Sequence, residues 1–142
     1  MNVNIYRIDN TLPLPKYETA GAAGFDLICR ESSEIKAGSI ALIPANIIIE
    51  VPEGYMLAVL PRSSTPKKGL MLANSLGVID NDYCGPEDEV KILVYNFTEK
   101  TVTVNRGDRI AQAIFVRIEC VEFCERQIPP SNVTRSGFGS TG

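Results

Sequence analysis

The residues best suited to chemistry lie between Asn74 and Asn96, a stretch that reads NSLGVIDNDYCGPEDEVKILVYN. Asp80 follows the apolar pair Val78-Ile79, so we expect its carboxylate where a strand leaves the core. A carboxylate in that position can take a proton from a water molecule and act as a general base. Asp80 and Asp82 are also typical of residues that form turns. The pattern therefore leaves two interpretations open, a catalytic carboxylate and a turn.

A second candidate group combines a cation with hydroxyl side chains. The segment Pro61-Arg62-Ser63-Ser64 ends a predicted strand. A guanidinium binds phosphate oxygens through two parallel hydrogen bonds, and serines add further donors. These residue types suit a polyphosphate, although the same tripeptide is typical of a solvated loop. Gln112 interrupts an apolar run and needs a partner if it is buried, which leaves a structural bond or a ligand contact open.

The C-terminal segment has the composition of an arm. Regular patterns stop after Glu125, Pro129-Pro130 favours extended backbone, and Arg135–Gly142 is mostly Gly, Ser and Thr. Such a segment is typical of a disordered tail. It also suits a flexible arm that closes over a ligand, with Phe138 stacked on a base and Arg135 on a phosphate.

These candidate groups must be positioned by strands. Apolar segments alternate with turn residues about every ten residues, which predicts a sandwich or barrel, and no long helical pattern is present. Gly69–Ala73 and the alternating Val90, Ile92 and Val94 predict a β-hairpin with a widened end. The other expected strands are Asn2–Ile8, Ala22–Ile28, Ser39–Ile43, Ile47–Val51, Tyr55–Leu60, Thr101–Val104 and Arg109–Val116.

Composition bounds the class of protein. A chain of 142 residues with 44% hydrophobic content is most consistent with one globular domain. A net charge of −3 and a pI near 5.0 argue against a general nucleic-acid binder. No apolar run has membrane-spanning length and the N-terminus has no signal-like apolar segment, so we expect no membrane partner and a cytoplasmic protein.

The absence of histidine excludes several kinds of active site. Neither a Ser-His-Asp nor a Cys-His triad can form within this chain, nor can the H-x-E zinc site of the usual nucleobase deaminases. The four cysteines, Cys29, Cys84, Cys120 and Cys124, include no C-x-x-C pair, so we expect free thiols rather than a zinc site.

Five motifs in order resemble those of the homotrimeric dUTP diphosphatases, the dUTPases. The third of them is G-V-I-D-N-D-Y-x-G around Asp80. The others are A-A-G-F-D-L at Ala22–Leu27, P-R-S-S at Pro61–Ser64, G-D-R-I-A-Q at Gly107–Gln112 and R-S-G-F-G-S-T-G at Arg135–Gly142. The resemblance implies an all-β, jelly-roll-like barrel over residues 1–125, a flexible C-terminal arm over 126–142, and a homotrimer with shared active sites.

The resemblance also implies an activity. A dUTPase converts dUTP and water into dUMP and diphosphate with the help of Mg²⁺, which lowers dUTP and supplies dUMP for thymidylate synthesis. Asp80 would activate the attacking water. Asp26, which from the residues alone suits a cap of the preceding turn, would approach the hydrated Mg²⁺ through water.

Further roles follow residue by residue from the matched motifs. The family's pattern assigns uracil recognition to Asn74 and to the main chain from Val78 and Ile79 to Lys91. Tyr83 would pack under the sugar and leave no room for a 2′-hydroxyl. The phosphates and the base would be held by Arg62, Ser63, Ser64, Gln112, Arg135, Phe138 and Gly139. Each site would draw on three chains.

The sequence departs from the family's pattern at two places. Pro86-Glu87-Asp88 adds about three residues between Gly85 and Glu89, and we expect this insert to point away from the triphosphate. The arm reads R-S-G-F, whereas the family usually has two more residues between Arg and Phe. The shorter spacing changes the reach of Arg135 relative to Phe138.

Two alternatives share the expected fold. A dCTP deaminase has a similar Arg-Ser-Ser segment but places a Glu where this chain has Leu93, which cannot exchange protons. A non-catalytic nucleotide-sensing or protein-binding module is the other alternative. The presence of Asp80 and Tyr83 argues for the enzyme.

Overall fold

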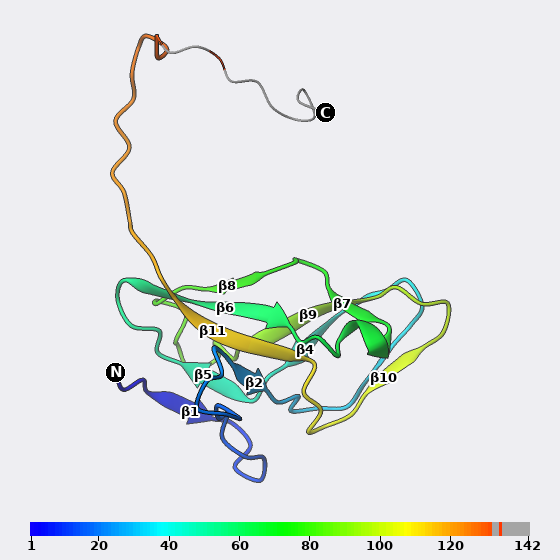
Figure 1. The fold of residues 1–142 in the computed structure, drawn as a ribbon. Coiled ribbons are helices and arrows are strands. Elements are labelled where there is room, and N and C mark those ends of the chain that lie inside the picture. The colour runs from blue at the N-terminus through cyan, green and yellow to red at the C-terminus, as the bar shows by residue number, and fades with distance from the viewer. Residues whose placement is uncertain (132–133, 135–142) are drawn as a thin grey trace.

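Short strands make up the regular structure, as the alternating apolar residues predict. The computed structural model describes residues 1–131 and residue 134. Within these residues the one helical element is the 3-10 turn η1 (Pro66–Lys68). The prediction of an all-β, jelly-roll-like barrel with little helix is confirmed (Figure 1).

Antiparallel pairing assembles the strands into two larger and two smaller sheets. The four-stranded sheet has the order β2 (Phe25–Leu27), β11 (Ala111–Arg117), β6 (Tyr55–Pro61) and β8 (Gly77–Ile79). The three-stranded sheet has the order β4 (Ile40–Pro44), β9 (Lys91–Asn96) and β7 (Leu70–Leu72). The remaining pairs are β1 (Ile5–Arg7) with β5 (Ile47–Ile49), and β3 (Ser33–Ile35) with β10 (Val102–Val104).

The core lies between the inward faces of these sheets. Along β9, Ile92 and Val94 are fully buried whereas Lys91 is exposed, the period of two expected of a half-buried strand. Leu27 and Leu57 contribute from the other large sheet and are also fully buried. Each such side chain stabilises the fold by about 1.5–3 kcal/mol relative to an exposed one. The hydrophobic effect therefore fixes the register that places the polar residues outside.

The widened hairpin is confirmed, and it contains an additional strand. Leu70 pairs with Asn96 and Leu72 with Val94, so the approach and return strands are antiparallel neighbours. Between them the chain leaves this sheet, and β8 pairs with β6 in the four-stranded sheet. The segment that carries Asp80 therefore bridges the two large sheets.

The far end of β9 is fixed by one buried amide. Asn96 is fully buried, and its Nδ2 donates hydrogen bonds to the carbonyl oxygens of Ile35 (2.8 Å) and Lys100 (2.7 Å). Its Oδ1 accepts a hydrogen bond from the backbone N–H of Thr98 at 2.9 Å. This anchor holds the end of β9 that lies away from Glu89.

The chain leaves the barrel after β11. The backbone N–H of Ile118 donates to the carbonyl oxygen of Gly54 at 2.9 Å, and residues 119–131 are exposed. Figure 1 shows this segment running away from the sheets. The division of the chain at residue 125 stays a prediction. No helix in the described part of the chain is long and apolar enough to cross a membrane.

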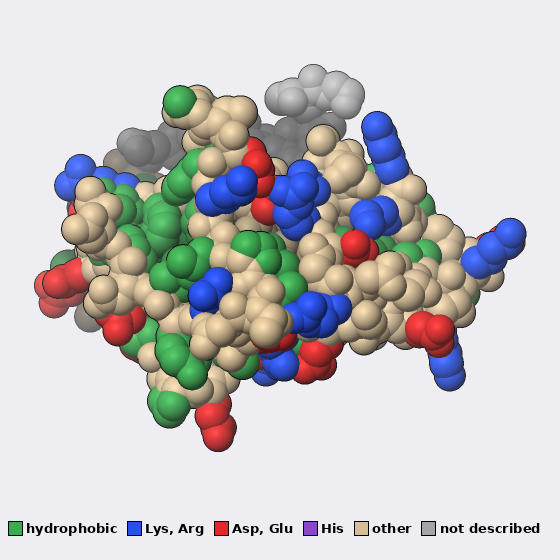
Figure 2. Space-filling model, turned by 90° about the horizontal axis from the view of Figure 1, so that it is seen from below, with side chains coloured by type: hydrophobic (Ala, Val, Ile, Leu, Met, Phe, Trp, Pro, Cys, Tyr) green, Lys and Arg blue, Asp and Glu red, His purple; other side chains and the backbone are tan. Residues whose placement is uncertain are grey.

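Charge is mixed on the surface shown in Figure 2. Basic and acidic side chains lie among one another on this face, with apolar patches between them. The chain as a whole carries a net charge of −3. An anionic ligand must therefore be bound by a local arrangement of cations, since the overall charge does not attract it.

Candidate active site

One carboxylate and two guanidinium groups form the charged centre of the site. Asp26 on β2 binds Arg62 with 2.8 Å between Oδ1 and Nε, and Arg109 with 3.2 Å between Oδ2 and Nη1. Only 12% of the Asp26 side chain is exposed. Arg62 Nη1 also donates to the carbonyl oxygen of Arg109 at 3.0 Å. The carboxylate thus fixes the direction of both arginines.

Three neighbouring strands bring these groups together. β11 pairs with β2 on one side and with β6 on the other, and Gln112 lies opposite both Asp26 and Leu60. Arg62 directly follows the end of β6. Residues that are far apart in the sequence are thereby placed on one end of one sheet.

The Arg62 turn is held by a buried threonine. Thr65 Oγ1 accepts a hydrogen bond from the backbone N–H of Arg62 (2.9 Å) and donates to the carbonyl oxygen of Ile110 (2.7 Å). The turn leaves Ser63 exposed and Ser64 partly exposed. Both predicted phosphate donors are therefore accessible at the edge of the arginine group.

Gln112 makes the structural hydrogen bond that the sequence left open. Its Nε2 donates to the carbonyl oxygen of Pro61 at 3.0 Å. The bond ties β11 to the beginning of the Arg62 turn and does not use the amide oxygen. A phosphate contact for Gln112 stays a prediction.

Close packing explains one glycine of the first motif. A Cβ atom on Gly24 would lie 2.8 Å from both the Ala113 carbonyl oxygen and the Ile114 Cγ2. A side chain there would push β2 away from β11, and with it Asp26 away from Gln112. The glycine is therefore needed for the approach of the two strands.

Asp108 and Arg109 are neighbours in the sequence but bind different partners. Arg109 binds Asp26 and also Glu18, with 2.7 Å between Nη1 and Oε1. Asp108 binds Lys68 at 3.3 Å and accepts the backbone N–H of Asn105 at 3.1 Å. Adjacent residues point to opposite sides of an extended chain, which is why neighbours in the sequence take different partners.

Asp80 and Tyr83 form a second group at the end of β8. Asp80 is exposed, and its carbonyl oxygen accepts the backbone N–H of Tyr83 at 3.3 Å. The Tyr83 hydroxyl donates to the carbonyl oxygen of Glu89 at 3.2 Å. Both residues are therefore held in one loop whose carboxylate faces solvent.

The other predicted base contacts lie before β8, on β8 and at the beginning of β9. Asn74 and Val78 are exposed, Ile79 is partly buried, and Lys91 is exposed at the beginning of β9. β8 pairs with β6 along one edge and is the last strand of its sheet. Main-chain donors and acceptors on the outer edge of an edge strand are available to a ligand.

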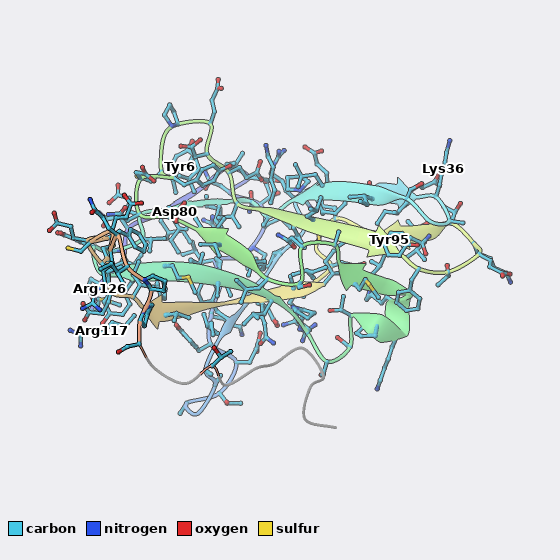
Figure 3. All side chains as sticks on the ribbon, turned by 90° about the horizontal axis from the view of Figure 1, so that it is seen from above. Tyr6, Lys36, Asp80, Tyr95, Arg117 and Arg126 are labelled. Atoms are coloured by element: carbon cyan, nitrogen blue, oxygen red, sulfur yellow. The ribbon has the colours of Figure 1, made fainter. Side chains whose placement is uncertain are left out.

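The two groups lie at opposite ends of β6. Leu57 pairs with Ile79, so Asp80 lies beside Met56, whereas Arg62 follows the other end of the strand. Met56 and Arg62 are six steps apart along the chain, about 20 Å at about 3.4 Å per residue. Figure 3 shows Asp80 at the same end of the molecule as Arg117, which pairs with Tyr55. One chain therefore does not bring Asp80 to the arginines.

The insert forms a closed turn. The Gly85 N–H donates to the Asp88 side chain at 2.7 Å, and the Asp88 N–H donates to the Gly85 carbonyl oxygen at 3.0 Å. Pro86 and Glu87 are exposed at the tip, as expected of a loop that points outward. Figure 3 shows the loop (light green) projecting from the sheets.

Sequence reasoning missed the partner of Glu89. Glu89 is buried and binds Arg30 through two parallel contacts of 2.9 Å. The hydrogen bond to this carboxylate raises the pKa of the Arg30 guanidinium. No local signal relates these residues, because 59 positions separate them.

The acidic side chains near Asp26 indicate how the expected Mg²⁺ could be held. No group of three or more His, Cys, Asp or Glu side chains that suits a metal ion occurs in the described residues. Asp26 lines a pocket of about 150 Å³ together with Glu18 and Arg109. This acidic residue beside two arginines fits a hydrated Mg²⁺ carried by phosphates better than a resident ion.

The predicted contacts of the arm are not located by the structure. Arg135, Phe138 and Gly139 lie outside the described residues.

Sequence comparison relates this chain to proteins of one kind. A family model described as dUTPase matches residues 10–142. Over 145 residues the chain is 41% identical to the deoxyuridine 5'-triphosphate nucleotidohydrolase of Streptomyces avermitilis, covering 100% of this chain and 81% of that protein.

Solved structures agree with the observed fold. The dUTPase of Streptococcus mutans is 37% identical with a TM-score of 0.77, over 84% of this chain and 98% of that chain. A mutant dUTPase from phage phi11 of S. aureus has a TM-score of 0.80 over 90% of this chain and 98% of that chain, and its 20% identity supports the fold alone. That structure reveals the coordination of a structural Mg(II) ion.

Proposed function

The chain belongs to the dUTPase family and hydrolyses dUTP, and from this premise we propose that its reaction takes place between copies of the chain. The observation that carries this proposal is the separation of Asp80 from Arg62 along β6, about 20 Å at about 3.4 Å per residue. A general base acts only within hydrogen-bond reach, directly or through one water. The Asp80 end of one copy therefore has to meet the Arg62 end of another.

The reaction converts dUTP and water into dUMP and diphosphate. In the proposed site Asp80 takes a proton from the attacking water, and no covalent intermediate forms. Arg62, Ser63, Ser64 and Gln112 bind the phosphate oxygens, with Ser63 beside the α–β linkage. Asp26 and Arg109 hold the Arg62 fork in its direction. Positioning and charge stabilisation supply most of the catalysis in such a reaction.

Mg²⁺ is the proposed metal. The ion would bind the phosphates and neutralise part of their charge, with Asp26 reaching it through water. Asp26 already accepts both arginines, which supports an indirect contact over a direct one.

Uracil and deoxyribose are read by the loop around β8. The proposed contacts are the Asn74 side chain and main-chain groups of Val78, Ile79 and Lys91, which suit the flat hydrogen-bonding edge of a base. The open outer edge of β8 supports this assignment. The Tyr83 ring lies under the sugar and excludes a 2′-hydroxyl.

Three copies form the proposed assembly. The outer face of the β4-β9-β7 sheet exposes large apolar side chains: Ile40 is 61% exposed, Leu42 55% and Met71 46%. Such a patch on a monomer is typical of a contact with another protein. The arm of a third copy would bring Arg135, Phe138 and Gly139. We place the enzyme in the cytoplasm, where free thiols such as these four cysteines persist.

A product assay tests the reaction and its alternatives. The purified chain is incubated with dUTP or dCTP and Mg²⁺, and diphosphate, dUMP and ammonia are quantified. We expect dUMP and diphosphate in equal amounts from dUTP. Ammonia from dCTP would instead indicate a deaminase, and binding without products would indicate a nucleotide-sensing module.

A further inference from the structure

Glu89 is the one buried charged residue among those that the structure describes, and it lies at the base of the loop that carries Asp80 and Tyr83. It is 6% exposed. Its carboxylate accepts hydrogen bonds from Arg30 Nε and Nη2, each at 2.9 Å, and from the backbone N–H of Asn46 at 2.8 Å. A buried charge is tolerated when it is paired and hydrogen-bonded. Three donors from two segments therefore hold Glu89 in one position.

Hydrogen bonds connect Glu89 to the loop that carries Tyr83 and Asp80. Its carbonyl oxygen accepts the Tyr83 hydroxyl at 3.2 Å. The Tyr83 N–H in turn donates to the carbonyl oxygen of Asp80 at 3.3 Å. A continuous series of hydrogen bonds thus runs from Arg30 through Glu89 to Tyr83 and Asp80.

The other end of this series is tied to the body of the protein. Asn46 is 1% exposed and has a left-handed backbone with φ of 65°. Its side chain binds Asp9 twice, accepting the N–H at 2.7 Å and donating to the carbonyl oxygen at 3.1 Å. Asp9 binds Arg106 with 2.7 Å between Oδ2 and Nη2. The anchor of Glu89 therefore uses other residues than the Asp26 group that is proposed to bind the phosphates.

We propose that Arg30 and Glu89 are a positioning pair that sets the Tyr83 ring at the height where it excludes a 2′-hydroxyl. The pair thereby contributes to the choice of deoxyribonucleotide over ribonucleotide. A bidentate pair fixes direction as well as distance, which apolar side chains of the same volume do not. The inference rests on the proposed role of Tyr83 as the sugar filter.

A double-mutant cycle tests whether Arg30 affects sugar discrimination through Tyr83. The variants are Arg30→Met, Tyr83→Phe and their combination, and the measured quantity is the ratio of kcat/KM for dUTP to that for UTP. Tyr83→Phe keeps the ring and removes the bond to Glu89. We expect each single variant to lower the ratio by about tenfold, within the range of coupling through packed networks. Because both changes release the same ring, the combination should lower the ratio no further.

A second set of variants separates positioning from stability. Arg30→Met leaves Glu89 buried without its partner and is expected to lower the Tm. Arg30→Met with Glu89→Leu removes both charges and should regain part of that stability, since the buried Asn46 N–H still loses its acceptor. In this double variant the ratio of kcat/KM for dUTP to that for UTP should stay lowered. Asn96→Ser is the matched control, because it loses a buried anchor at the other end of β9, and it should lower the Tm without changing the ratio.

The outcomes distinguish the inference from its premise. A folded Arg30→Met/Glu89→Leu variant with the wild-type ratio would overturn the positioning role, as would additive effects in the cycle. Tyr83→Ala decides the premise. If Tyr83→Ala lowers the ratio of kcat/KM for dUTP to that for UTP while the Arg30 and Glu89 variants do not, Tyr83 is the sugar filter. Only the positioning role of Arg30 and Glu89 is then wrong. If Tyr83→Ala leaves the ratio unchanged, the sugar filter lies elsewhere and both assignments fall.

Discussion

The carboxylate of Asp80 lies exposed at the end of β8, where a water molecule can reach it. Its place was predictable, because an apolar pair followed by Asp, Asn and Asp marks the point where a strand leaves the core. The surroundings of Asp26 could not be predicted in the same way. Its binding to Arg62 and Arg109 joins three segments, and only the pairing of β2, β11 and β6 brings them together. The sequence could not show these partners, because they depend on which strands become neighbours.

Asp80→Asn should abolish hydrolysis while preserving the fold. An amide cannot take the proton of the attacking water, and the loss of a positioned base lowers the rate by about 10²–10⁴. Diphosphate release measures the effect, and binding of a non-hydrolysable dUTP analogue should be unchanged. Turnover close to that of the wild type would remove Asp80 from the mechanism.

Cys29 should resist alkylation in the native protein. The thiolate is the reactive form, and burial raises the pKa of the Cys29 thiol to about 12. Cys120 and Cys124 are exposed and serve as internal controls. Mass spectrometry after iodoacetamide treatment at mildly alkaline pH should find both modified and Cys29 unmodified, with all sites modified in denaturant. Equal labelling of Cys29 in the native state would contradict its burial.

At the scale of elements, the alternation of apolar residues was enough to predict most strands and the hairpin of β7 with β9. It did not predict β3, whose segment Ser33–Ile35 has a single apolar residue. Nor did it predict that β8 pairs with β6 in the other sheet. Alternation tells which face of a strand is buried, but not which neighbour the strand will have.

Deletion of Pro86–Asp88 should leave hydrolysis of dUTP largely intact. The insert forms its own turn between Gly85 and Asp88, and its tip is exposed. Shortening a surface loop changes its closure entropy by only about 0.6 kcal/mol per halving of length. The measurement is kcat/KM for dUTP, with thermal unfolding as the control for folding. A folded deletion variant without activity would place the insert in the site.

At the scale of the whole molecule, the length of β6 keeps the proposed base away from the proposed phosphate site. Composition gave no indication of this separation, because it depends on which strand β8 joins. The exposed apolar face of β4, β9 and β7 likewise emerges only when these strands lie side by side. Both features support the shared sites that the family resemblance implies.

Complementation tests the sharing of sites. Asp80→Asn and a chain truncated after Asn132 should each be nearly inactive alone. Co-refolded as mixed trimers they should regain partial activity, because some sites receive an intact loop from one chain and an intact arm from another. Homotrimers of each variant are the controls. If mixed trimers form and no activity returns, the loop and the arm of one site come from the same chain.

The unlike ends of β6 also give each chain a direction. In the proposed three-fold ring the Arg62 end of one copy would meet the Asp80 end of the next, so the contact would join two different surfaces. Two copies joined in this way form one contact and leave one Arg62 end and one Asp80 end without a partner. Closing the ring uses both. In the proposed ring the final subunit to arrive would complete two junctions at once, and the activity per chain would then measure ring closure as well as chemistry.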